Sequence, residues 1–75
     1  MVERGQIHTV RSVAKASGGQ LVHCDGVSFG IVGGPEIAPG DVMEVGNVCG
    51  GWCFLFVKGE RVRANIVEMP VERES

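Results

Sequence analysis

The chain has 75 residues, of which 44% are hydrophobic and 21% are charged, and its formal net charge at pH 7 is −2. These values are typical of one folded domain with a small core, and they exclude a disordered chain and a second domain. The acidic balance gives no overall attraction to nucleic acid or anionic membranes, so any such binding needs a local basic patch.

Twelve glycines and the lack of a sustained helical period favour short strands joined by tight turns. The longest apolar run, residues 52–57, is too short to cross a bilayer, and no secretory signal opens the chain. Three cysteines are an odd number, which argues against a disulfide framework. We therefore expect a small, soluble, cytoplasmic protein without a membrane span.

The first expected strand spans residues 6–15 and ends in the turn sequence ASGGQ. Asp25-Gly26 then stands between two β-type runs and is a favoured two-residue hairpin turn, because both central positions need positive φ. This turn pairs Val22 with Phe29. One face of the hairpin then carries a set of apolar residues that we expect in the core: Val22, Cys24, Val27, Phe29 and Ile31.

Residues 33–41 (GGPEIAPGD) follow as a connection whose glycines and prolines cannot continue a central strand. Residues 41–48 are the next expected strand. The glycines at positions 50 and 51 form a turn into an aromatic strand that starts at Trp52.

The last expected hairpin has Gly59-Glu60 at its centre, since glycine suits the first central position of a type II′ turn. One face then carries only aliphatic residues and cysteine: Cys53, Leu55, Val57, Val62, Ala64 and Ile66. The other face carries rings, charges and an amide: Trp52, Phe54, Phe56, Lys58, Arg61, Arg63 and Asn65. Because a charged residue is almost never buried without a partner, the second face is expected to look outward.

Short antiparallel strands joined by tight turns predict an all-β fold, a small five- to six-stranded antiparallel barrel of the OB-like or SH3-like sort. Residues 1–69 are expected to form this single β-barrel domain. Residues 70–75 are expected to form a charged flexible tail.

Three outward aromatic side chains approach or exceed the apolar patch that a soluble monomer usually exposes, so we expect something to cover them. The cover could be the chain itself (its amino-terminal segment or the loop at residues 35–39), another protein surface, or single-stranded nucleic acid. In the last case bases would stack on the rings while Lys58, Arg61 and Arg63 contact phosphates. Aromatic residues ringed by arginine are typical of a protein interface, which we favour.

The sequence therefore predicts a non-enzymatic protein-interaction or assembly module, acting as a homo-oligomer or as a subunit of a larger assembly. Its partner-binding residues are predicted to be Trp52, Phe54, Phe56, Lys58, Arg61, Arg63 and Asn65. Single-stranded nucleic-acid binding on the same face is the alternative.

The cysteines and histidines are the candidates for metal, redox or nucleophilic chemistry. Cys49 and Cys53 have a spacing that zinc sites use, which gives a further alternative, a structural zinc site. However, a turn at residues 50–51 places these two cysteines on opposite faces, so we predict no metal and no cofactor. Nothing in the spacing brings His8 or His23 to a cysteine, and the sequence CGGWC has one residue too many for a redox motif. We predict no catalytic site.

Residues 18–57 resemble the carboxy-terminal OB domain of NfeD-like proteins. The similarity consists of a glycine, a strand, the Asp25-Gly26 turn, the pattern I-x-x-G-D-x-x-x-V at residues 37–45, and a final apolar strand. NfeD-like proteins usually work beside stomatin-like membrane partners. The resemblance implies an OB fold and a role as a protein-interaction module, and it implies no catalytic residues.

Overall fold

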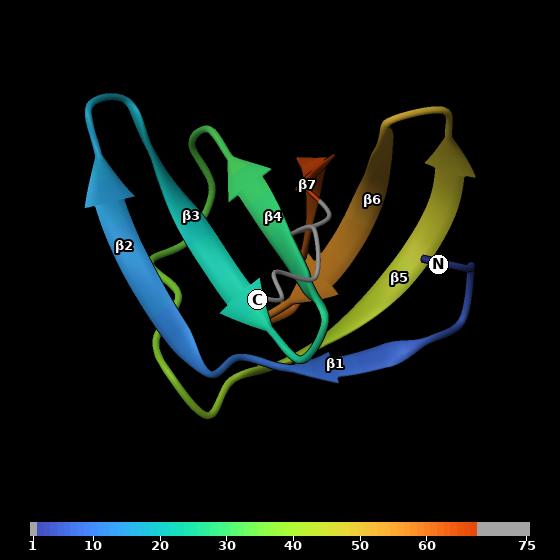
Figure 1. The fold of residues 1–75 in the computed structure, drawn as a ribbon, viewed down its shortest axis with the longest axis horizontal. Coiled ribbons are helices and arrows are strands. Elements are labelled where there is room, and N and C mark those ends of the chain that lie inside the picture. The colour runs from blue at the N-terminus through green and yellow to red at the C-terminus, as the bar shows by residue number, and fades with distance from the viewer. Residues whose placement is uncertain (1, 68–75) are drawn as a thin grey trace, which may run out of the picture.

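The computed structural model describes residues 2–67, which form one curved antiparallel sheet (Figure 1). Its strands are β1 (Ile7–Thr9), β2 (Ser12–Ala16), β3 (Gly19–Cys24), β4 (Val27–Ile31), β5 (Val42–Cys49), β6 (Trp52–Val57) and β7 (Glu60–Val67). Their order in the sheet is β1-β5-β6-β7-β4-β3-β2, and the sheet curls into an open half-barrel. The expected all-β, barrel-like class is confirmed, with seven strands instead of five or six. The described residues include no helix that could cross a membrane.

Two meanders, β2-β3-β4 and β5-β6-β7, make up most of the sheet. The long connection between β4 and β5 carries the chain across the barrel, so that β4 pairs with β7. In Figure 1 this connection runs behind β3 and β2 before it enters β5. Ile37 anchors the connection, because its side chain is fully buried and its N–H donates to the side-chain carbonyl oxygen of Gln20.

The seventh strand arises because the expected first strand bends at Val10-Arg11. The Val10 N–H donates to the Asp41 carbonyl at 2.8 Å, and the Arg11 N–H donates to the His23 carbonyl at the same distance. One segment therefore pairs with β5 before the bend and with β3 after it. This bend joins β1 and β2, the two edge strands of the sheet.

The β3–β4 hairpin has the register that the sequence predicts, with Cys24 opposite Val27 and Val22 opposite Phe29. Its turn differs in one respect, since Gly26 has a φ of 78° but Asp25 lies outside the positive-φ region. A single glycine is thus enough for this turn.

The β6–β7 turn was predicted at the wrong position. Its central residues are Lys58 and Gly59, with φ values of 53° and 76°, and Val57 pairs with Glu60. Positive φ at both positions is the type I′ geometry, whose twist matches that of the strands. The left-handed Lys58 is secured by its own ammonium, which donates to the Glu36 carbonyl at 2.7 Å.

The error in the turn leaves the faces of the hairpin unchanged. Phe56 pairs with Arg61, where the predicted register gave Arg63. This is a slip of two residues, and only an odd slip would exchange the two faces of a strand. The aliphatic set from this hairpin is accordingly inside: Cys53, Leu55, Val57, Val62 and Ala64 are buried, and Ile66 packs against them in part.

Candidate aromatic–arginine interface

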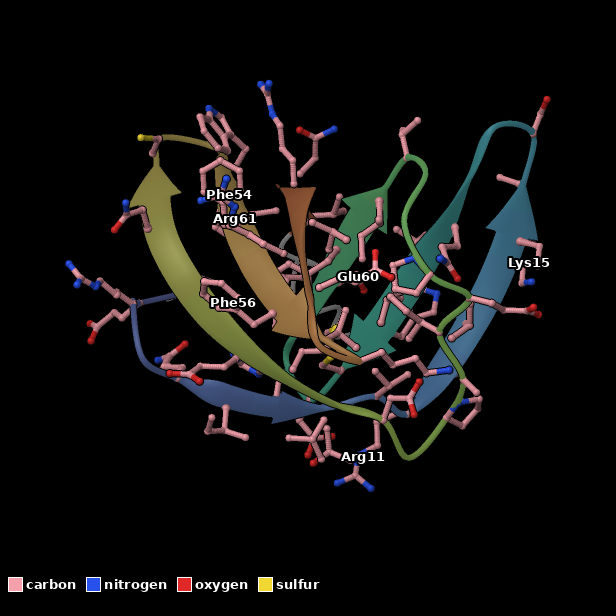
Figure 2. The ribbon with its side chains drawn as sticks, turned by 180° about the vertical axis from the view of Figure 1, so that it is seen from behind. Arg11, Lys15, Phe54, Phe56, Glu60 and Arg61 are labelled. Carbon is pink, nitrogen blue, oxygen red and sulfur yellow. The ribbon has the colours of Figure 1, made fainter. Side chains whose placement is uncertain are left out.

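Strand β6 separates an inner from an outer face. Leu55 is 0% exposed, whereas its neighbour Phe56 is 46% exposed and Trp52 and Phe54 are half-buried. The expected outward orientation of the rings is therefore confirmed. We call the outer side chains of β6 and β7 the aromatic–arginine face: Trp52, Phe54, Phe56, Arg61, Arg63 and Asn65. Figure 2 shows Phe54, Phe56 and Arg61 together over β5 and β6, far from Lys15 on β2.

Two arginines lie on the rings of this face. The guanidinium carbon of Arg63 is 4.3 Å from the Trp52 ring centroid, and that of Arg61 is 4.8 Å from the Phe54 centroid. The two rings meet edge to face, with centroids 5.1 Å apart and an interplanar angle of 88°. Each arginine therefore reaches diagonally across the strand pair, a contact that long side chains can make in a sheet. The chain's own arginines cover part of the aromatic surface.

A bulge in β5 provides the surface on which the phenylalanines rest. Val45 pairs with Leu55 and Val48 with Cys53, so β5 carries one extra residue opposite Phe54. Gly46 lies in this bulge, and a Cβ there would be 3.0 Å from a Phe56 ring carbon. The lack of a side chain lets the rings approach the strand. A shallow groove beside them is lined by Arg4, Gly46, Asn47, Phe54, Phe56 and Arg61.

A second groove borders the face on its β4 side. Asn65 pairs with Trp52 on one side and with Gly30 on the other, and Gly30 leaves space because a Cβ there would approach no atom closer than 3.9 Å. Arg63 and Asn65 form one wall of this groove, with Val32 opposite. The face is thus a ridge of rings and arginines between two depressions.

Charge pairing sets the arginines of this face apart from other cations. Ion pairs join Arg11 to Asp25 at 2.7 Å, Lys15 to Glu36 at 2.9 Å and Lys58 to Asp41 at 3.5 Å. Within residues 2–67, the cations without a carboxylate at such a distance are Arg4, Arg61 and Arg63. All three border the aromatic–arginine face.

Ion pairing also lowers the pKa of two exposed carboxyl groups, Asp25 beside Arg11 and Glu36 beside Lys15.

Lys58 was predicted to belong to the binding face. The structure places it in the turn, where its ammonium holds the connection at Glu36 and Asp41.

Exposed aliphatic side chains extend the face across β5 and β1. Ile7 is 59% exposed and Val42 is 55% exposed, and both lie on the outer side of their strands. Glu44 lies between Ile7 and Phe56, because it pairs with both. This extension was not predicted from the sequence, since the pairing of β1 with β5 is a long-range contact without a local turn signal.

The cysteines and histidines are spread over the sheet. Cys53 is buried, which raises the pKa of its thiol, while Cys49 is exposed at the β5–β6 turn. His23 hydrogen-bonds the buried Ser28 hydroxyl at 2.7 Å, and His8 packs edge-on against Phe29. Among residues 2–67 no three such side chains or carboxylates cluster where they could bind a metal.

Comparison with protein-family models, with curated proteins and with solved structures found no match to this chain. The resemblance to NfeD-like OB domains therefore stays a prediction.

Proposed function

We propose that this protein is a non-enzymatic interaction module that binds a protein partner with its aromatic–arginine face. One observation carries the proposal: the described cations that lack a carboxylate partner gather on the same outer face as the exposed rings. Aromatic residues and arginine are the types that contribute most to the centre of a protein interface. An assembly subunit in the cytoplasm, with an OB-like or SH3-like barrel as its scaffold, fits this role.

The stacked arginines favour a partner that carries carboxylates. A guanidinium that lies over a ring has already lost part of its rotational freedom, and its N–H edges still point away from the ring. Such an edge binds a carboxylate through two parallel hydrogen bonds. The partner surface should therefore combine apolar area with acidic side chains.

Single-stranded nucleic acid fits the same face less well. Bases would stack on ring faces, but Arg61 and Arg63 already occupy a face of Phe54 and Trp52. Glu44 also lies next to Phe56, where a phosphate backbone would meet its charge. Both observations support a protein partner.

Photo-crosslinking in cells tests the proposal. The protein carries p-benzoylphenylalanine at Phe56 or, as a matched control, at the exposed Ala14 on the outer side of β2. We expect discrete protein adducts from position 56, lost when Arg63→Glu is added, and none from position 14. The adduct mass then tells a second copy of this 8.0 kDa chain from another protein.

Two results would contradict the proposal. Equal adducts from both positions would mean that the face has no special affinity. Adducts that a nuclease removes would assign the face to nucleic acid.

A further inference from the structure

Four side chains on four adjacent strands form one row across the outer face. Ile7 pairs with Glu44, Glu44 with Phe56, and Phe56 with Arg61. Neighbouring strands are about 4.8 Å apart, so the backbone positions of an acid and a base flank the half-exposed ring at similar distances. Glu44 and Arg61 are both exposed, and within residues 2–67 neither forms an ion pair.

This row is complementary to itself under one symmetry operation. A twofold axis that runs along β6 at Phe56 leaves the ring facing its own copy and exchanges the positions of Glu44 and Arg61. Each Glu44 then lies opposite Arg61 of the other copy, and two equivalent ion pairs form when each guanidinium turns from Phe54 toward that carboxylate. An axis at right angles to the strands would instead place Glu44 on Glu44 and Arg61 on Arg61, which is repulsive.

We propose that the partner of the aromatic–arginine face is a second copy of this chain, bound about a twofold axis parallel to β6. This inference rests on the proposed function and specifies its partner. Twofold pairing of identical surfaces is the commonest form of self-association. Rotation about β6 keeps the strands of the two sheets aligned, as face-to-face sheets commonly are. The exposed Ile7 and Val42 form the apolar rim of the contact.

The guanidinium of Arg61 rests beside the row, over Phe54, and turns toward Phe56 to make this contact. It lies 4.8 Å from the Phe54 ring centroid, which holds it against the sheet. The ring covers one face of the guanidinium, so its N–H edges remain free to bind the incoming carboxylate. Because the outer face of a half-barrel is convex, the contact is limited in area. We expect a weak dimer, with a dissociation constant on the order of 1 μM or weaker.

Charge reversal with recombination of variants tests this arrangement. Sedimentation equilibrium over a dilution series is measured for the wild type, for Glu44→Arg, for Arg61→Glu and for an equimolar mixture of the two variants. Each variant alone should dimerise roughly 100-fold more weakly, since two attractive contacts become repulsive. The mixture should recover near wild-type affinity. In the mixed dimer one chain carries arginine at positions 44 and 61 and the other carries glutamate at both, so both contacts are attractive again.

Lys15→Glu is the matched control, since it reverses a charge on β2 far from this face (Figure 2) and should leave the affinity unchanged. Urea unfolding of each variant verifies that it is folded. A wild type that stays monomeric at 1 mM (on the order of the weakest specific contacts) would overturn the second-copy proposal. So would a dimer that neither variant weakens, or a mixture that fails to recover. Crosslinks from position 56 to a different protein would leave the proposed function standing in any of these cases.

Discussion

Replacing Leu55 with glutamine should unfold the protein, whereas the same replacement at the next residue, Phe56, should leave it folded. Leu55 is 0% exposed, so the variant loses about 2 kcal/mol of apolar burial. It also buries an amide without a partner, at a cost of about 1–3 kcal/mol. The sum of about 3–5 kcal/mol is comparable to the whole stability of a domain of this size.

The matched change at Phe56 costs less. The ring is 46% exposed, and if it buries about 100 Å² the upper estimate of the loss is ~2.5 kcal/mol. The glutamine amide stays in water and has no desolvation penalty. Urea unfolding followed by circular dichroism measures both variants. A folded Leu55→Gln together with an unfolded Phe56→Gln would refute our assignment of the two faces.

Three further outcomes are expected. Gly46→Ala should destabilise the fold by about 1 kcal/mol, because the added Cβ would be 3.0 Å from a carbon of the Phe56 ring. Gly30→Ala should change the urea midpoint little, because the nearest atom to its added Cβ would be 3.9 Å away. Arg11→Gln should raise the pKa of Asp25 in an NMR titration, since the Arg11 guanidinium lowers that pKa in the wild type. The Arg11–Asp25 ion pair stabilises the fold above about pH 4, and this stabilisation is lost as the pH falls through the lowered pKa of Asp25. A thiol reagent at pH 8 should modify the exposed Cys49 first, because burial raises the pKa of the other two thiols, and all three should react in denaturant.

Each of these outcomes has a result that contradicts it. Equal urea midpoints for the two glycine variants would mean that the bulge does not support the rings. An unchanged Asp25 titration would mean that the ion pair does not persist in solution. Simultaneous labelling of all three thiols in the native protein would show that the core is open.

Local signals in the sequence were enough to place the two faces of the sheet. The β3–β4 register followed from Asp25-Gly26 alone, because a two-residue turn fixes every pair in its hairpin. The β6–β7 faces were also predicted, although glycine at position 59 was assigned to the wrong turn position. The alternation of aliphatic and charged residues along each strand was enough to identify its buried and its exposed face, even with the turn misplaced.

Non-local contacts could not be predicted from local patterns. Lysine is rarely left-handed, so nothing local favoured a turn at Lys58-Gly59; what secures it is a bond to Glu36, in a connection distant in the sequence. The bend at Val10-Arg11 likewise depends on partners in two other strands. Long-range pairing of this kind leaves no periodic pattern in the chain.

The candidate face was predicted in its central residues but not in its extent. Alternation along β6 and β7 identified the rings and arginines. The contributions of Arg4, Gly46 and Glu44 come from segments whose neighbours are set by the sheet order. The predicted tail at residues 70–75 lies outside the described residues.

Quenching of tryptophan fluorescence tests the outward face most directly. Trp52 is the single tryptophan of the chain and the chain has no tyrosine, so its emission reports this face alone. The Trp52 indole lies beside Arg63. At low salt its fluorescence should be quenched by iodide and much less by caesium, because the arginines attract an anion and repel a cation. Emission from the folded protein that neither ion quenches would mean that the indole lies inside the barrel, and the proposed interface would be lost.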